Sequence, residues 1–517
     1  MAGGFLPYHE PGIVEILIII SFFFFLSLAE WASAKIIRAG IIGHIAVGII
    51  YGKPLADILE MDWQRTFLSL GYVGLILIIF EGGLSARLDL LKANLVLSML
   101  GAATGVCFPI GLSYLLLYLG FGYGAVETFI IGAALSATSL GTTFAVISSA
   151  SSTVNLAQTR VGAVLVSAAV IDDVVGLVMA SVISNLNQLQ GNSNINLGWL
   201  IGRPIVASVA MALITPLATK YLFAPLFRCF IEHHFARFDH ISNIILMILS
   251  LSAFITIAAY TGTSVLFGAF LAGTFLTYLP SKHPDGPFVV MSREEGERDK
   301  HKSPTFVHTF ERYLVDVQKY LMEPLFFASI GFAIPFLDLW TGRGVWRGVV
   351  YTLLMVVGKF VVGIWVPLWG SCSARIRSRK HRHCKSSRKK ESQIDDTDQT
   401  GPGQENAETR NANRTTTWLS ALLLGSAMVA RGEIGLLIIE IGYNETAYVT
   451  EDGFITGVWA ILLNTIIGPA TVGVLVRFCG RRIGEGEWGL QVGRPGEVVS
   501  GQGQGGEGMG VGRRASV

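Results

Sequence analysis

The sequence is poor in charge and in cysteine. Only 15% of its 517 residues are charged, whereas soluble globular chains usually carry about 25%. Its 39 basic and 37 acidic residues nearly cancel, leaving a net charge of +2. This balance excludes a nucleic-acid-binding domain, a disordered chain and an ordinary soluble enzyme. The five cysteines are scattered without a CxxC pair, so neither a disulfide framework nor a zinc site is expected.

Long apolar runs take the place of charge. Hydrophobic residues make up 51% of the chain, and several runs exceed about 18 residues, the length that indicates a membrane-spanning helix. We count about thirteen such segments and predict an all-α polytopic membrane protein. The segments are 13–34, 41–59, 67–84, 95–121, 125–150, 161–186, 199–223, 241–260, 264–279, 321–339, 345–369, 418–441 and 454–476.

The basic residues are distributed unevenly between the two sides of these segments. Most of them follow odd-numbered segments or lie in the C-terminal tail, and the opposite side carries only Lys53, Arg65, Arg203, Arg343 and Arg347. Because cytoplasmic loops carry an excess of lysine and arginine, we expect the N-terminus outside and the C-terminus in the cytoplasm. The membrane is a plasma or organellar one.

Composition also indicates how the chain divides into a transmembrane domain, long loops and a tail. We predict one transmembrane domain over residues 1–476, with long cytoplasmic loops at 280–316 and 371–416. Residues 477–517 are expected to form a disordered, glycine-rich cytoplasmic tail. The second loop contains RIRSRKHRHCKSSRKKE, a basic run that could contact anionic lipid. The formal GxGxxG at 503–508 has no strand before it and no helix after it, which excludes dinucleotide binding.

Ionisable residues at mid-membrane depth are the most informative part of the sequence. An unpaired charge there costs several kcal/mol, so it needs a partner or a water-filled cavity. By contrast, Glu15, Glu30, Glu323 and Glu440 lie nearer helix ends, where snorkelling or water is a sufficient explanation. The mid-membrane set is Glu81, Asp172, Asp173, Lys359, Arg431 and Glu433.

Asp172 and Asp173 stand near the middle of the sixth segment. Neighbours on a helix point about 100° apart, so one carboxylate can contact another helix while the other faces a cavity. The two charges repel each other and burial disfavours both, so such a pair exchanges protons near physiological pH. It also offers hard oxygen ligands to a small cation. A group that binds a proton or a cation, but not both, is the minimum for exchange.

Lys359 has apolar residues on both sides, so it must lose its proton or find an anion, and Asp172 or Asp173 is the natural candidate. Arg431 and Glu433 are two residues apart and face nearly opposite sides of a regular helix. Glycines at 425 and 432 weaken that helix and predict a local break.

The fifth segment carries hydroxyl groups and small residues in one run, which are Ser136, Thr138, Ser139, Gly141, Thr142 and Thr143. Hydroxyls and free carbonyls at a helix break can coordinate a cation, and transporters place such broken helices in two related positions, one per repeat. The fifth and twelfth segments are seven apart, as an inverted repeat requires. The alternative is a serine- and threonine-rich helix-packing interface.

Together these motifs resemble the monovalent cation/proton antiporter superfamily, most closely its second branch of sodium/proton and potassium/proton antiporters. The resemblance covers residues 12–476. IDDVVGL at 171–177 is the most specific match. The other matches are GHIAVGIIYGKP at 43–54, FEGGL at 80–84, SATS at 136–139, FGAFLAG at 267–273, EPLFFASIGF at 323–332, GKFVVG at 358–363 and ARGE at 430–433.

The resemblance implies roles for these residues. Asp173 would be the main ion- and proton-binding carboxylate and the ligand of Na⁺, while Asp172 would bridge to Lys359 and release it when sodium enters. Thr138 and Ser139 would line the site. ARGE places Arg431 and Glu433 on a motif of one subgroup, as further charge partners.

The implied fold is a homodimer of protomers with inverted repeats and two crossing discontinuous helices. Each protomer would have a dimerisation domain and a six-helix core that moves in an elevator-like step. The paired aspartates favour electrogenic exchange, although a further charge pair could change the proton count. Na⁺, K⁺ or Li⁺ and H⁺ would be the substrates, with membrane lipid around the protein, no nucleic-acid partner and no cofactor.

The same residues also bear on other possible functions. An intramembrane aspartyl protease needs two aspartates on different helices, and prenyl transfer needs a further acidic residue beyond DDVVG, so both enzyme classes are disfavoured. A cation channel or a transport-inactive sensor remains open, and the preferred cation is not fixed. Asn444 begins a glycosylation sequon on the expected outer side.

Overall fold

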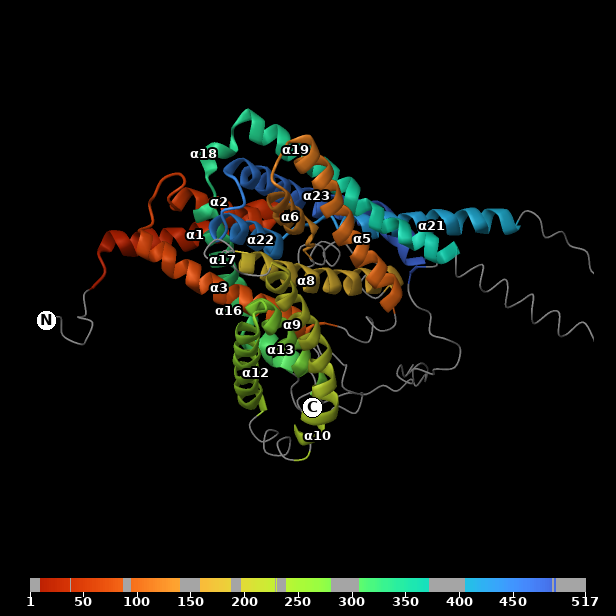
Figure 1. Ribbon diagram of the computed structural model, residues 1–517, viewed down its shortest axis with the longest axis horizontal. Coiled ribbons are helices and arrows are strands. Elements are labelled where there is room, and N and C mark those ends of the chain that lie inside the picture. Colours follow the sequence, from red (N-terminus) through yellow and green to blue (C-terminus); the bar gives the residue numbers. More distant parts are fainter. Residues whose placement is uncertain are drawn as a thin grey trace, which may run out of the picture.

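The computed structural model describes residues 10–37, 39–86, 94–139, 159–186, 197–227, 229, 239–279, 306–371, 405–485 and 488–489. Within these residues the chain is helical, with no strand (Figure 1). Helices are expected in lipid, since each backbone N–H and C=O must find a partner inside its own segment. Every one of the expected apolar segments contains helix, which confirms the all-α membrane fold.

Eight of the helices in the described ranges are long and apolar enough to cross a membrane, judged by length and composition. They span Ile13–Ile36, Met61–Leu84, Leu95–Gly120, Arg160–Leu186, Ile201–Leu226, His240–Thr261, Gly342–Ser371 and Glu451–Gly484. The remaining segments are shorter or interrupted helices, and two of these interruptions form the candidate site.

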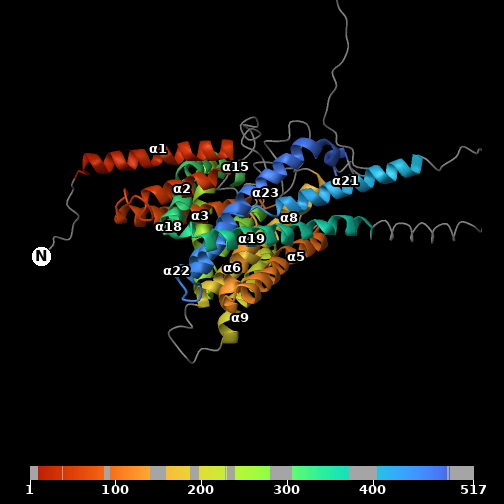
Figure 2. The same ribbon diagram turned by 90° about the horizontal axis from the view of Figure 1, so that it is seen from above.

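The helices pack in two groups. The first, called the α3 group, contains α1 (Ile13–Ile36), α2 (Gly40–Tyr51), α3 (Met61–Leu84), α12 (Asp239–Thr261), α13 (Val265–Tyr278), α15 (Phe306–Tyr313), α16 (Val315–Val317), η6 (Gln318–Met322) and α17 (Glu323–Ala333). Its closest pairs are α3 with α13, α1 with α2, and α17 with α2. Figure 2 shows α1, α2 and α3 side by side.

The second, called the α8 group, contains α5 (Leu95–Ser113), η1 (Tyr114–Gly120), α6 (Ala125–Ser136), α8 (Arg160–Leu186), α19 (Gly342–Phe360), η7 (Val361–Ile364), α21 (Glu405–Ala427), α22 (Glu433–Asn444) and α23 (Glu451–Glu485). Short α18 (Phe336–Leu339) precedes α19. The groups meet where α13 contacts α8 and α17 contacts α22.

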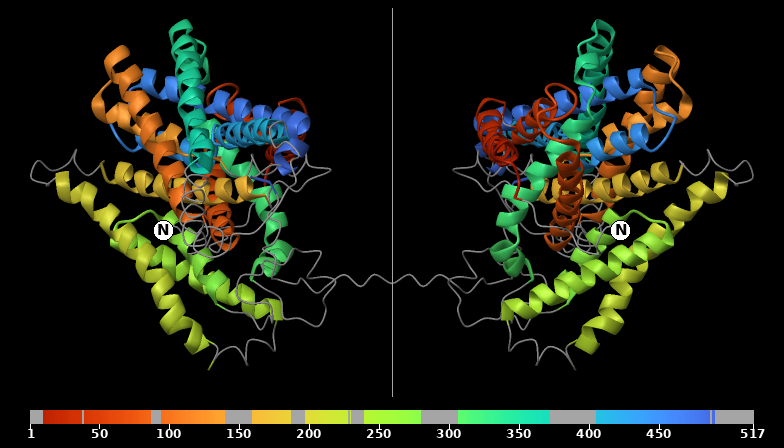
Figure 3. Two further views of the ribbon diagram at one scale, coloured as in Figure 1. Left: turned by 90° about the vertical axis from the view of Figure 1, so that its right-hand side faces the viewer. Right: turned by 90° about the vertical axis from the view of Figure 1, so that its left-hand side faces the viewer.

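A connecting element, α9 (Leu197–Ala218), continues through η4 (Thr219–Phe223) and α10 (Ala224–Leu226) and packs on both α8 and α13. In Figure 3 α9 and α12 form a wedge below the other helices. Both expose long apolar faces, as lipid-facing helices do.

Parts of the two expected cytoplasmic loops are helical. In the first, expected at 280–316, α15 begins at Phe306. In the second, expected at 371–416, α21 begins at Glu405. The sequence ENAETRNANR includes alanine, glutamate and arginine, which have good helix propensity, so a polar loop segment can still form helix.

The expected boundary of the disordered tail at residue 477 is also wrong. Helix α23 continues to Glu485, and Trp488 is only 1% exposed. The Val161 backbone N–H donates to the Trp488 carbonyl at 3.1 Å, and the Arg160 guanidinium lies 4.6 Å from the Trp488 ring centroid. A buried indole and a cation–π contact therefore hold this segment against the start of α8.

Glycines bring the backbones of α3 and α13 into contact. A Cβ added at Gly83 would lie 2.2 Å from the Phe270 carbonyl oxygen, and one at Gly273 would lie 2.4 Å from the Phe80 carbonyl oxygen. Neighbouring Gly82 has nothing within 4 Å of the same position. Membrane helices use small residues in this way to approach closely.

We expect Gly83→Ala to lower the melting temperature in detergent, because overpacking costs about 1–3 kcal/mol. Gly82→Ala is the matched control, since it adds the same atom to open space and alanine is the better helix former. Thermal unfolding of both purified variants measures the difference. Equal melting temperatures would contradict the close packing of α3 on α13.

Candidate functional site

The end of α6 and the gap between α21 and α22, here called the two breaks, lie at the same place in the α8 group. Helix α6 ends at Ser136 because Ala137 takes an extended backbone, with φ −62° and ψ 139°. Helix α21 ends at Ala427 and α22 begins at Glu433, which leaves residues 428–432 outside regular helix. The carbonyls at a helix end have no partner within the helix, so both breaks present acceptors to other side chains.

The two breaks are joined by a backbone hydrogen bond. The Ser139 N–H donates to the Ala430 carbonyl at 2.9 Å. A Cβ at Gly432 would lie 2.6 Å from Ser139 Cβ, and one at Gly468 of α23 would lie 2.5 Å from the Ala430 nitrogen. Glycine is therefore required at both positions, because the chain passes too close for any side chain.

Lys359 reaches this crossing from α19 with its side chain fully buried. Its Nζ donates to the Ser136 carbonyl at 2.6 Å, to Thr138 Oγ1 at 3.0 Å and to Asp172 Oδ2 at 3.2 Å. An ammonium has three donors, so all of them are satisfied. One acceptor is a helix-end carbonyl, one a hydroxyl and one a carboxylate.

Asp172 is also 0% exposed. Its Oδ2 accepts hydrogen bonds from both Thr138 and Lys359. Its Oδ1 is buried and has no hydrogen-bond partner in the part of the chain that the structure describes. Removing one member of such a buried pair costs about 3–5 kcal/mol, because the other charge is left uncompensated.

Arg431 is a second fully buried cation at the crossing. Its Nη1 donates to the Ala137 carbonyl at 3.0 Å and to the Met428 carbonyl at 3.2 Å. Arg431 thus connects one carbonyl of each break. The sequence predicted Arg431 and Glu433 as further charge partners on nearly opposite sides of a helix, and among the described residues no ion pair links the two.

Asp173 lies on a different side of α8 from Asp172 and is half-buried, whereas Asp172 is completely enclosed. Its Oδ1 has no hydrogen-bond partner within the described ranges. Gly176, one turn further along α8, packs against Ile434: a Cβ there would lie 3.1 Å from Ile434 Cγ2. Glu433 adjoins Ile434 and is also half-buried, so both carboxylates belong to the region where α8 packs on α22.

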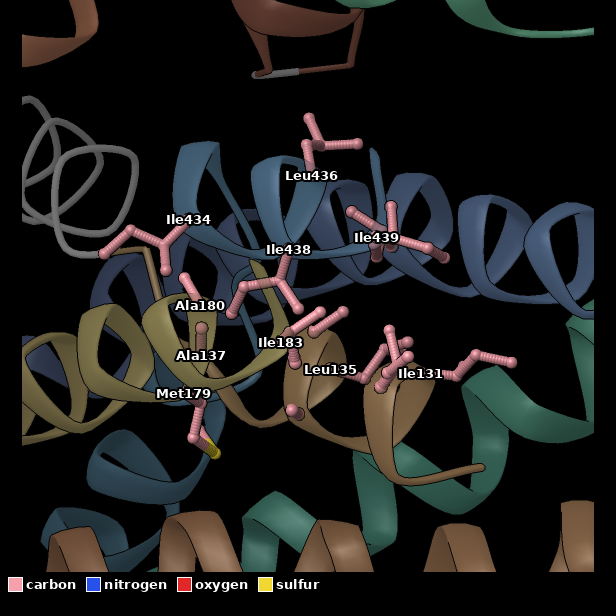
Figure 4. Close-up of a cluster of buried hydrophobic side chains, with 14 of the residues drawn as sticks. Ile131, Leu135, Ala137, Met179, Ala180, Ile183, Ile434, Leu436, Ile438 and Ile439 are labelled. Atoms are coloured by element: carbon pink, nitrogen blue, oxygen red, sulfur yellow. The ribbon is translucent and has the colours of Figure 1, made fainter. Parts of the chain in front are cut away.

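An apolar core holds these helices behind the site. Figure 4 shows Ile434 and Ile438 of α22 beside Ala180 and Ile183 of α8. Leu135 of α6 belongs to the same buried cluster. This packing fixes the breaks relative to α8, so the polar groups at the crossing keep their positions.

The family model described as "Sodium/hydrogen exchanger, transmembrane" matches residues 19–478, which include every site residue above. The chain belongs to the sodium/hydrogen exchanger family.

Several relatives within and around this family match most of the chain. A Na⁺/H⁺ antiporter of Enterococcus hirae is 23% identical over 434 residues, covering 83% of this chain and 89% of the relative. The Na⁺/H⁺-K⁺ antiporter GerN of Bacillus cereus is 24% identical over 450 residues, covering 86% of this chain and 91% of the relative. Both relatives are described as antiporters, which are transporters and not enzymes.

The fold also matches a solved exchanger structure. The sodium proton antiporter MjNhaP1 from Methanocaldococcus jannaschii aligns with a TM-score of 0.55 and 18% identity. The alignment covers 89% of this chain and 98% of that one. At 18% identity the likeness shows the fold alone, and that fold agrees with the helical architecture described above.

The structure brings some of the sequence-predicted residues together and separates others. Asp172, Thr138 and Lys359 are in direct contact, while Ser139 contributes its backbone to the crossing. Glu81 lies in the α3 group, where its Oε2 accepts a hydrogen bond from Gln318 at 2.5 Å. Asn444 stands exposed at the end of α22. The predicted residues Gly141, Thr142 and Thr143 lie outside the described ranges.

Sequence reasoning missed part of the Lys359 pocket. A Cβ at Gly105 of α5 would lie 3.4 Å from Lys359 Nζ, so this glycine borders the ammonium group. Small residues at 101–103 and 105 in an otherwise bulky segment were the available signal. The carbonyls of Ser136 and Ala137 were missed because main-chain acceptors leave no trace in residue type.

Proposed function

We propose that this protein is a secondary active antiporter that exchanges a monovalent cation (Na⁺, K⁺ or Li⁺) for H⁺ at a paired-aspartate site. One observation carries the proposal. A fully buried Lys359–Asp172 pair sits where α6 ends beside the gap between α21 and α22, and the half-buried Asp173 is its direct neighbour. Membership of the exchanger family supports the reaction.

In the proposed cycle Asp173 binds either the cation or the proton. Its unpartnered oxygen and its partial accessibility suit a ligand that must enter and leave. Asp172 turns from Lys359 to the cation when the cation enters. Lys359 would then keep the Ser136 carbonyl and Thr138 as acceptors, so its release of Asp172 leaves two of three hydrogen bonds in place.

Alternating access is proposed to follow an elevator-type step. The α8 group carries Asp172, Asp173 and Lys359 together, and the crossing bonds tie its helices into one unit. It meets the α3 group chiefly through α13 and α17, so movement at that interface changes the side to which Asp173 is open. The α3 group would form the homodimer interface.

The proposed orientation has the N-terminus outside and the C-terminus in the cytoplasm. Contacts between helix ends agree with this alternation. Arg347 at the start of α19 lies 3.4 Å from Asp452 at the start of α23, as two odd-numbered segments require. Thr277 near the end of α13 donates to the Leu84 carbonyl at the end of α3 at 3.0 Å. These two helices are also odd-numbered segments, so their ends are expected on the same side of the membrane.

Reconstitution tests the proposed function. Purified protein in liposomes with an imposed pH gradient should show a change of internal pH when Na⁺, K⁺ or Li⁺ is added. The coupled flux should require both ions, because one site serves both. Cation flux without proton movement would instead indicate a channel, and absence of any flux would indicate a transport-inactive sensor; either result would reject the antiporter.

A further inference from the structure

A cavity of about 510 Å³ lies between the α3 and α8 groups. Its walls come from α3, α8, the turn between α12 and α13, α17 and α22. It is therefore placed at the interface across which the two groups would slide. Its polar lining groups are Tyr72, Ser181, Ser184, Asn185, Thr263, Ser264, Ser329, Glu440, Asn444 and Glu445.

The cavity and the candidate site lie along the same faces of α8 and α22. Along α22, Glu433, Leu437, Glu440 and Asn444 follow one another at intervals of three or four residues, which places them on one helix face. On α8, Asp173, Ala180 and Ser184 share a face in the same way. Leu437, Glu440, Asn444, Ala180 and Ser184 line the cavity. Asp173 and Glu433 thus lie about 10 Å deeper, at a rise of about 1.5 Å per residue.

Glu440, in the wall of this cavity, has a buried carboxylate oxygen without a donor among the described residues. Its Oε2 accepts a hydrogen bond from Asn444 Nδ2 at 2.6 Å. Its Oε1 is buried and has no hydrogen-bond partner within the described part of the chain. A buried acceptor without a donor is costly, and a bound cation or proton would satisfy it.

The rest of the lining suits a cation. Glu445 supplies a second carboxylate, whose Oε2 accepts a hydrogen bond from Ser184 at 2.9 Å. No lysine or arginine is among the described residues that line the cavity. Arg203, which packs against Gly262, instead donates to the Tyr260 carbonyl at 3.3 Å. Carboxylate, amide and hydroxyl oxygens are the ligands that hard cations prefer.

We propose that this cavity is a second cation site, in which Glu440 binds the transported monovalent cation before it reaches Asp173. The cavity opens beside Asn444, on the side proposed to be outer. Negative charge in a narrow, low-dielectric cavity raises the local concentration of cations. Glu440 therefore determines how efficiently dilute cation is taken from this side. The inference rests on the proposed function, since it concerns the same transported ion.

The test is Glu440→Gln in proteoliposomes whose insertion direction is established by protease access to a C-terminal tag. Glutamine keeps the shape and a carbonyl oxygen for Asn444 but removes the charge. We expect the Na⁺ concentration for half-maximal exchange to rise about three- to tenfold when Na⁺ is added on the cavity side. The maximal rate, and uptake from the opposite side, should stay near the unaltered values.

Asp62→Asn is the matched control. Asp62 is an exposed carboxylate at the start of α3 that pairs with Arg65 at 3.7 Å, outside the cavity lining. It should leave the half-maximal concentration unchanged. Glu440→Asp should restore much of the lost affinity, because it keeps the charge, and this distinguishes a cation site from a packing defect.

Three outcomes would overturn the second site. These are an unchanged half-maximal Na⁺ concentration in Glu440→Gln, an equal change on both sides, and a Glu440→Asp variant no better than Glu440→Gln. Each of these results counts only if the unaltered protein exchanges ions in the same assay. If the unaltered protein shows no cation-dependent proton flux, the proposed function itself has failed, so the two failures are distinguishable.

Discussion

Asp173→Asn is expected to abolish cation-dependent proton exchange, with a loss of at least about 100-fold that reaches the background of empty liposomes. Asparagine has nearly the shape of aspartate but cannot hold a proton or a negative charge at this position. The proposed coupling depends on one group that binds either ion. The measurement is internal pH in proteoliposomes after addition of Na⁺, K⁺ or Li⁺.

The Asp173→Asn substitution should abolish transport without destabilising the fold. Asp173 is half-buried and its Oδ1 has no partner among the described residues, so the substitution breaks no ion pair there. The melting temperature should be unchanged or slightly raised. Asp338→Asn, the same change at an exposed residue of α18, should keep full exchange. An Asp173→Asn protein with normal flux would remove Asp173 from the site.

Lys359→Met should have the largest effect on stability. It leaves Asp172 fully buried with Thr138 as its only remaining hydrogen-bond donor among the described residues. Breaking a buried pair in this way costs about 3–5 kcal/mol. Thermal unfolding in detergent should show a strong decrease in melting temperature, and exchange should show weaker cation affinity or an altered pH dependence.

The double variant Asp172→Asn with Lys359→Met provides the control. Replacing both partners removes the uncompensated charge, so much of the stability lost in Lys359→Met should return. The difference between the double variant and the sum of the two single ones measures the coupling. Additive effects would show that the pair contributes nothing, although its atoms are 3.2 Å apart.

Much of this architecture follows from residue type and spacing. Uninterrupted apolar runs predict membrane helices reliably, because lipid leaves the backbone no other partners. Gly432 predicted the break between α21 and α22, since a residue without a side chain both weakens a helix and permits close approach. Adjacent aspartates with a distant lysine predicted where charge would have to be compensated.

Other parts could not be predicted because they depend on how distant segments meet. Arg431 was predicted only as a charge partner, and sequence could not show that it donates to the Ala137 carbonyl, 294 positions away. Glu440 was explained by its nearness to a helix end, whereas the fold places it in a cavity between two helix groups. Residues 405–416 were taken as loop because they are polar, but α21 includes them.

The bond between Lys359 and Asp172 also bears on how the protein is made. The two residues are 187 positions apart, so at about 5–20 residues per second Asp172 leaves the ribosome about 10–40 seconds before Lys359 does. During that interval the sixth segment must enter the membrane with its carboxylates protonated or hydrated. Arg431, which joins the two breaks, is synthesised later still. The first half of the chain is therefore an unfinished membrane protein until its second half arrives, and ribosome stalling in between would expose it to quality control.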